Sequence, residues 1–259
     1  MIKQRYDIMR RLFAILLVII TMLSLAACGG DSEKPIINNE ISSTENSPKP
    51  DNTEAEEIYS NKVSYVGDDI PAGNYAINCT KSEYGMDILV FESEQKFKDF
   101  QGAEQFTVGE YQTAVETHAW ANFYVKENEF TYIGLKKGYV ILLDDGMCEF
   151  NKYDANSSTT IYSGIYVVGE DIAAGNLNIK CTSDRMQVTA FETKDNYVSY
   201  HQTSRFTVGE ESDAIEKYAL SSDYIGKDKV TSVNLKAGMI LVVDNGIGEY
   251  SVDAGPVIN

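Results

Sequence analysis

Histidine is the side chain best suited to proton transfer near neutral pH, and the chain contains two, His118 and His201. A tandem repeat described below aligns His118 with Tyr218 and His201 with Gln101, so neither histidine recurs in the other copy. This pattern excludes a catalytic histidine common to both copies, while one catalytic copy with a degenerate partner stays open. The residue types favour a protein that is not an enzyme, and we assign no catalytic residue and no cofactor.

Carboxylates recur in adjacent pairs, as Asp68-Asp69, Glu170-Asp171 and Asp144-Asp145. Two carboxylates on either side of a glycosidic bond can hydrolyse it, and clustered carboxylates bind Ca²⁺. The first two pairs follow a glycine in a turn-forming stretch, where aspartate accepts hydrogen bonds from backbone N–H groups. We therefore interpret them as turn-capping residues, with calcium binding as the alternative, and assign no metal ligand.

Cysteines are few in this chain. Cys28 belongs to an N-terminal motif discussed below, and Cys79, Cys148 and Cys181 remain. An odd number allows at most one disulfide among them. Cys79 and Cys181 occupy matching positions of the repeat, which favours buried free thiols that behave as small apolar groups. A Cys79–Cys148 bridge is the alternative, and Gly248 stands where the second copy would need its partner.

The chain after residue 57 contains the same unit twice, with a period of 100 to 103 residues. Such spacing is far longer than that of solenoid repeats and typical of a duplicated domain. We place repeat 1 at 58–154 and repeat 2 at 160–253. The recurring segments include Val66–Asn74 with Val168–Asn176, Cys79-Thr80 with Cys181-Thr182, and the pentapeptide Phe106-Thr107-Val108-Gly109-Glu110, which returns unchanged at 206–210.

Each repeat is predicted to be mainly β. Alternating or β-branched and aromatic residues indicate strands over Gly73–Cys79, Met86–Phe91, Phe130–Leu135 and Tyr139–Leu143. The D-G and N-G dipeptides at 145–146 and 245–246 predict hairpins, and apolar residues at helical spacing predict one short helix over Ala114–Ala119 and again over Ala214–Ala219. The fold class is therefore all-β: two tandem homologous domains, each a mostly antiparallel, sandwich-like unit of about six to eight strands with a short helical insertion.

Aromatic residues mostly fall on the expected strands. We interpret Tyr65, Tyr75, Tyr132 and Tyr139 as core and cross-strand packing residues. Trp120 stands in the helical stretch, where the second copy has Leu220. Packing beneath the helix is the favoured role of Trp120, and exposed recognition is the alternative.

The N-terminus has a basic start, an apolar run of about 14 residues from Leu12 to Leu25, and then Ala26-Ala27-Cys28. This run is too short for a permanent membrane helix, which needs about 20 apolar residues, and is typical of an export signal. Leu25-Ala26-Ala27-Cys28 resembles the lipobox of bacterial lipoproteins. The resemblance implies cleavage of a signal peptide at 1–27 and attachment of a diacylglycerol to the Cys28 thiol, which would anchor the chain to the extracytoplasmic face of the cell membrane.

Residues 28–57 are rich in Asn, Ser, Glu, Pro and Lys, contain almost no large apolar side chains, and are predicted to form a disordered acidic linker. The formal charge of the whole chain is −17, and because the signal segment carries a net charge of +3, its removal leaves the rest near −20. A chain this acidic repels phosphate backbones, so we expect no nucleic-acid partner.

The pattern Val-Gly-x-Asp-Ile-x-Ala-Gly-Asn, followed by a Leu-Lys-x-Gly strand, resembles a β-domain of many bacterial lipoproteins and exported proteins. It spans roughly 63–153 and 165–252, and it implies fold and location without an activity. Together these features predict a lipid-anchored, extracytoplasmic binding or interaction protein, whose partner would be a cell-wall polymer or a protein. The alternatives are a cell-envelope hydrolase with a site in one repeat, and a purely structural spacer.

Overall fold

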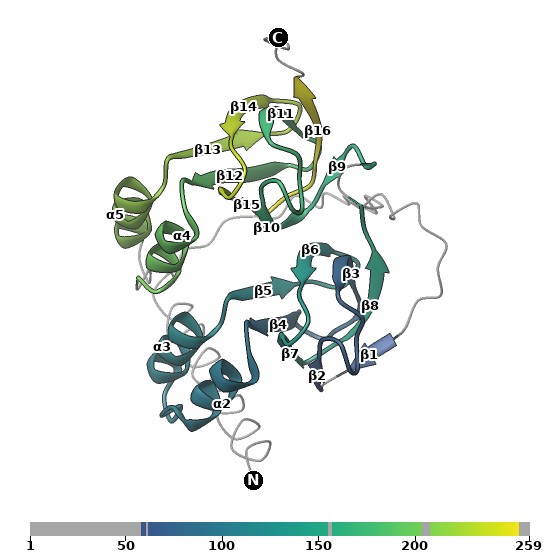
Figure 1. Ribbon diagram of the computed structural model, residues 1–259, viewed down its shortest axis with the longest axis vertical. Helices are drawn as coiled ribbons and strands as arrows, with labels where there is room; N and C mark the ends of the chain where they lie inside the picture. The colour runs from purple at the N-terminus through teal and green to yellow at the C-terminus, as the bar shows by residue number, and fades with distance from the viewer. Residues whose placement is uncertain (1–57, 61, 155–156, 204–207, 254–259) are drawn as a thin grey trace, which may run out of the picture. The chain divides into compact units, whose positions relative to one another are not determined.

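The structure is a computed structural model that describes residues 58–60, 62–154, 157–203 and 208–253. These residues belong to one compact unit, Ser47–Asn259. They form a mostly β protein with three largely antiparallel sheets, and four helices lie within the described ranges (Figure 1). The predicted signal peptide, 1–27, and the whole of the linker predicted for 28–57 lie outside the described residues.

Both repeats have the same order of elements. The first contains β1 (Ile58–Ser60), β2 (Val63–Tyr65), β3 (Gly73–Lys81), β4 (Met86–Phe91), α2 (Glu94–Gly102), α3 (Val108–His118), β5 (Ala121–Val125), β6 (Phe130–Leu135), β7 (Val140–Asp144) and β8 (Met147–Lys152). The second contains β9 (Thr160–Ile161), β10 (Ser163–Val167), β11 (Gly175–Cys181), β12 (Arg185–Phe191), α4 (Lys194–His201), α5 (Val208–Tyr218), β13 (Ser221–Gly226), β14 (Val230–Leu235), β15 (Ile240–Asp244) and β16 (Gly248–Asp253).

Strand pairing is also repeated. In the first repeat β1-β8-β3-β6 and β2-β7-β4-β5 form two sets of four strands, and the second repeat has the equivalent sets β9-β16-β11-β14 and β10-β15-β12-β13. The set β1-β8-β3-β6 and the set β10-β15-β12-β13 join into one eight-stranded sheet. A single hydrogen-bonded sheet therefore contains strands of both repeats.

The junction between the repeats is a parallel pair of strands, β6 and β10, in which Thr131, Tyr132 and Ile133 lie opposite Ser163, Gly164 and Ile165. The sequence did not predict this parallel pairing, because it joins strands of different repeats. A Cβ atom on Gly164 would lie 2.4 Å from the backbone oxygen of Tyr132, so only glycine allows this approach. The rings of Tyr132 and Tyr166 stack across the junction with centroids 4.0 Å apart.

The predicted strands are confirmed at β3, β4, β6 and β7, with bounds that agree within two residues. The predicted helices are confirmed as α3 and α5. Thr107 caps α3 by accepting a hydrogen bond from Glu110 N, and the Glu110 carboxylate accepts from the N–H groups of Thr107 and Phe106. This reciprocal capping box fixes the start of α3 within the unchanged pentapeptide.

The prediction of a single helix per repeat is wrong, because α2 and α4 precede the expected ones. Ser93 and Thr193 cap these additional helices. In α2 the buried residues are Phe97 and Phe100, and in α4 their counterparts Tyr197 and Tyr200 are buried as well. Spacing of three residues is a weak signal in helices this short, which is why sequence reasoning missed them.

The predicted hairpins are wrong as well. Asp145 and Asn245 adopt positive φ angles of 64° and 58°, as a tight turn requires. However, β7 and β8 pair in different sheets, as do β15 and β16. A Cβ on Gly146 would lie 2.8 Å from the Cβ of Met86, and one on Gly246 would lie 2.4 Å from the backbone oxygen of Arg185. Each glycine thus lets the chain cross close to the preceding strands as it passes between sheets.

Burial of the tyrosines follows the prediction in part. Tyr75 and Tyr132 are buried, with 4 % and 0 % of their surface exposed, and Tyr139 is partly buried. Tyr65 is 37 % exposed, so its assignment to the core is wrong. It lies on β2, a strand that pairs only with β7 among the described strands.

Candidate functional site

The two histidines do not occupy equivalent positions of the repeats, yet they line the same small pocket where the repeats meet. The pocket has a volume of about 40 Å³. Its walls come from α4, from the C-terminal end of α3 with the two residues after it, and from Glu92 and Lys96; they include His118, Trp120, Tyr197 and His201. A volume of this size holds one or two water molecules, so the pocket itself cannot enclose an organic substrate.

His201 holds the two repeats together. Its side chain is 6 % exposed, and its Nδ1 and Nε2 atoms lie 3.3 Å from the backbone oxygen of Glu116 and 3.3 Å from Oδ1 of Asn122. Both of these contacts are with repeat 1. These contacts give His201 a structural role between the two repeats.

His118 has a different environment. Its Nδ1 atom is buried and has no hydrogen-bond partner among the described residues. Burial lowers the pKa of His118, the nearby Lys96 lowers it further, and Asp99 opposes the change. A neutral imidazole is therefore favoured at pH 7, and its nitrogen could accept a proton.

Trp120 is a packing residue, as the sequence favours, but the contacts that its ring makes are with α4 of the other repeat and not beneath its own helix. Its indole ring meets the ring of Tyr197 edge to face at 4.9 Å, and the Tyr197 hydroxyl donates to the Trp120 backbone oxygen at 2.9 Å. The Lys194 ammonium lies 4.9 Å from the centre of the indole ring. These contacts anchor α4 of repeat 2 on the end of the helical segment of repeat 1.

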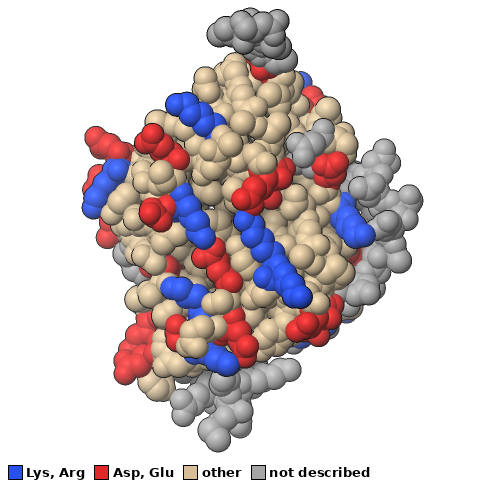
Figure 2. Space-filling model, in the orientation of Figure 1, with Lys and Arg blue, Asp and Glu red and all other residues tan. Residues whose placement is uncertain are grey.

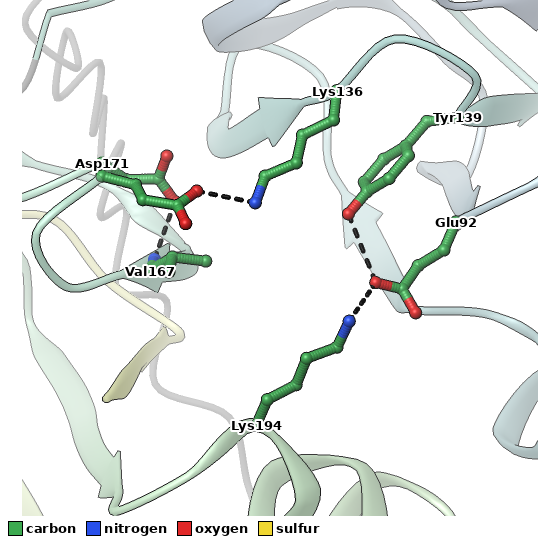
Figure 3. A network of polar contacts seen from close by, with 7 residues as sticks. Glu92, Lys136, Tyr139, Val167, Asp171 and Lys194 are labelled. Carbon is green, nitrogen blue, oxygen red and sulfur yellow. Dashed lines mark hydrogen bonds and ion pairs between the residues drawn. The ribbon is translucent and has the colours of Figure 1, made fainter. Parts of the chain in front are cut away.

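A polar network continues this interface (Figure 3). The Glu92 carboxylate accepts from Lys194 of the other repeat and from the Tyr139 hydroxyl, while Lys136 pairs with Glu170 of the other repeat at 2.6 Å. On the face drawn in Figure 2, basic and acidic side chains are likewise interspersed. The repeats thus contact one another through sheet, aromatic rings and ion pairs together.

The turn carboxylates behave as predicted for turn-capping residues. Asp69 accepts from Tyr65 N at 2.8 Å, and Asp171 accepts from Val167 N at 2.7 Å. Asp171 lies at the junction, where a Cβ on Gly134 would come within 2.8 Å of its Oδ1 atom. Burial raises the pKa of Asp171. In the described part of the chain, no three His, Cys, Asp or Glu side chains come together as metal ligands.

An open groove of about 570 Å³ lies along α3 of repeat 1 and the loop that precedes this helix. Residues of the unchanged pentapeptide line it, namely Thr107, Gly109 and Glu110, together with Glu104 and Thr117 further along. Phe106 and Val108, which flank Thr107, are 66 % and 58 % exposed. In the sequence this pentapeptide indicates the repeat, and its exact duplication is the signal that could also indicate a site.

Two glutamates, Glu104 and Glu110, line the groove, which is open to solvent. No lysine or arginine is among the described residues that line it. A Cβ atom added to Gly109 would meet no atom within 4 Å, so the space above the start of α3 is free. Such a shallow, acidic groove suits an extended partner that carries positive charge better than a small molecule that must be enclosed.

Cys28, the predicted lipid-attachment residue, lies outside the described residues. None of the described helices is long and apolar enough to cross a membrane. Comparison of the chain with protein-family models, with curated proteins and with solved structures finds no match.

Proposed function

We propose that this chain is a lipid-anchored, extracytoplasmic binding protein, and that it binds its partner at the helix pairs of its two repeats. The observation that carries the proposal is the duplicated pentapeptide of residues 106–110. Its residues Thr107 and Glu110 form the capping box of α3, which accounts for them structurally. Phe106 and Val108 are largely exposed, so packing in the core does not account for these two residues of repeat 1.

The partner we propose is a cell-wall polymer or protein segment that bears amino groups. The overall charge of −17 and the glutamates of the groove favour a cationic partner. Two similar sites on one chain would bind a repeating partner with avidity, because the second contact forms at high effective concentration. We further propose that each repeat is one sandwich-like module, held away from the membrane by the acidic linker 28–57.

Binding is tested with the full chain, purified in detergent with Cys28→Ser, using isolated cell walls and a lysine-rich peptide as probes. Gly109→Lys should reduce binding by roughly tenfold, because it fills the groove and adds positive charge. Gly102→Lys, at the end of α2, is the matched control, since a side chain there also meets no atom within 4 Å. Equal binding by the two variants would contradict the groove, and the absence of binding by the parent chain would favour a structural spacer.

Anchoring is tested separately in cells. The parent chain should incorporate a labelled fatty acid and sediment with membranes, and Cys28→Ala should do neither. Cys181→Ala, which leaves the lipobox intact, should be labelled as the parent is. Labelling of the Cys28→Ala chain would contradict the proposed lipid site.

An enzyme is the second candidate, and the observation in its favour is the neutral, unpartnered Nδ1 atom of His118. The small volume of the adjoining pocket weighs against it. This candidate would be supported if the purified chain had a hydrolytic activity that both His118→Ala and His118→Tyr abolish.

A further inference from the structure

Cys79 and Cys148 lie directly opposite each other on the antiparallel strands β3 and β8. Both side chains are fully buried, and both belong to the same core cluster, so they point to the same side of the sheet. The structure describes them as free thiols.

The type of strand pairing brings these two cysteines close. Cys79 N donates to the Glu129 oxygen at 3.2 Å, and the Cys79 oxygen accepts from Asn128 N at 2.8 Å. Both backbone groups of Cys79 therefore point toward the β6 side and away from β8. The pair Cys79–Cys148 is consequently a non-hydrogen-bonded pair, the kind whose Cα atoms lie about 4.5 Å apart. Disulfides span Cα separations of about 4.4–6.8 Å, so the backbone already meets this requirement.

Repeat 2 provides an internal comparison. Cys181 occupies the same place on β11, with its N–H donating to Lys229 and its oxygen accepting from Asp228 N, both at 2.9 Å. The residue opposite is Gly248. A Cβ there would lie 2.7 Å from the backbone oxygen of Lys180, so repeat 2 has neither a second thiol nor room for one.

We infer that Cys79 and Cys148 form a cross-strand disulfide in repeat 1 and that Cys181 stays a free thiol. The oxidant is a disulfide of a small thiol or of an oxidoreductase. One cysteine thiolate attacks it to form a mixed disulfide, and the other thiolate then displaces the second oxidant sulfur. The oxidant disulfide is reduced to two thiols, which take up the two protons that Cys79 and Cys148 lose.

Oxidation takes place while repeat 1 folds. In the folded chain, burial raises the pKa of Cys148 to about 12 and also raises the pKa of Cys79. Few thiolates are then present to attack an oxidant, and the closed core keeps the oxidant out. Once formed, the bond closes a loop that includes most of repeat 1, which is the condition in which a crosslink restricts the unfolded chain strongly.

The test uses the full chain with Cys28→Ser, unfolded and reduced, then refolded in oxidised glutathione and alkylated. We expect peptide mapping to find the Cys79–Cys148 bond and alkylated Cys181, and the Tm to exceed that of the reduced chain by about 10 °C. Cys79→Ala and Cys148→Ala should have equal Tm values in oxidised and reduced form, whereas Cys181→Ala should retain the full difference. Each variant is compared with itself, so a loss of stability caused by the substitution does not affect the outcome.

A second arm adds oxidised glutathione to the folded, reduced chain. The bond should form at least about a hundredfold more slowly than during refolding, because few thiolates are present at pH 8. Three alkylated cysteines after oxidative refolding, or a bond that involves Cys181, would overturn the inference. A different result would contradict the export on which the proposed function depends. In that result, Cys79 and Cys148 form the disulfide on refolding in vitro but are found as reduced thiols in intact cells.

Discussion

Asp69 and Asp171 make the same backbone hydrogen bond in different surroundings. Asp69 is exposed in its turn, whereas Asp171 is 6 % exposed at the junction between the repeats. Burial disfavours the charged carboxylate and raises the pKa of Asp171, although its bond from Val167 N and the nearby Lys136 oppose the change. The folded chain therefore takes up a proton at Asp171 at a higher pH than the unfolded chain, whose carboxyl has a pKa near 3.8.

The sign of the pH effect follows from proton binding. Between the unfolded and the raised folded pKa, the folded chain binds more protons, so the free energy of unfolding falls as pH rises. We expect Asp171→Asn, which keeps an acceptor for Val167 N, to be as stable as the parent at pH 7 or more stable by up to about 1 kcal/mol. This advantage should shrink at pH 3.5, as measured by urea denaturation.

The exposed turn provides the control for this substitution. Asp69→Asn should change the free energy of unfolding by less than about 0.5 kcal/mol at either pH. A loss of more than about 1 kcal/mol in Asp171→Asn at pH 7 would mean that the charged form is the stabilising one.

Single residues also mark the limit of what the sequence predicts about the site. The sequence identifies His118 and His201 as candidate bases, but it does not predict that they line the same pocket. It depends on the packing of α4 against the end of α3, a contact between segments about 80 residues apart. No local pattern encodes such a contact, and the lack of a repeated histidine even suggested that the two were independent.

At the scale of elements, the strands and the helices that follow the pentapeptide were predictable because their signals are local. Tyr75, Ile77 and Cys79 alternate on β3, and all three are buried. The junction was harder, because it joins β6 to β10 and depends on small residues on both strands. Its only sequence signal is a difference between the copies: Gly134 and Gly164 stand where the outer strands have Asn234 and Lys62.

Gly164 gives the sharpest test of the junction. Gly164→Ala places a Cβ 2.4 Å from the backbone oxygen of Tyr132, which cannot move without breaking the strand pairing. We expect a loss of about 1–3 kcal/mol in the free energy of unfolding, measured by urea denaturation. Gly102→Ala is the control, since a Cβ there meets nothing within 4 Å, and it should be neutral or slightly stabilising. Equal stability of the two variants would contradict the close approach.

At the scale of the whole molecule, the junction joins unlike edges. The β6 edge of one repeat meets the β10 edge of the next, so β14 and the counterpart strand β2 are left at the ends. Among the described strands each of these has one partner, β11 and β7 respectively. Unlike edges can in principle add copies without end. However, the residues that form the β6–β10 junction are absent from the equivalent positions at these ends. On β14, Ser232 and Asn234 are the counterparts of Tyr132 and Gly134, and next to β2, Lys62 is the counterpart of Gly164.

Introducing the junction residues at β14 and next to β2 should make the chain associate with itself. We expect the parent chain with Cys28→Ser to stay monomeric, and the triple variant Lys62→Gly, Ser232→Tyr, Asn234→Gly to form larger species as its concentration rises. Sedimentation velocity distinguishes the two. The single variant Ser232→Thr, which adds no aromatic ring, serves as the control. A triple variant that stays monomeric would mean that the tyrosine and glycine positions do not define the junction.

The eight-stranded sheet also bears on how much the covalent connection between the repeats contributes to holding them together. Because β6 and β10 bond directly and the core clusters contain residues of both repeats, the connection between β8 and β9 adds little to their association. A protease site inserted after Asp154 should therefore yield a nicked protein that elutes as one species and separates only in denaturant. The two halves would then behave as complementing fragments, each able to recognise the other without being joined.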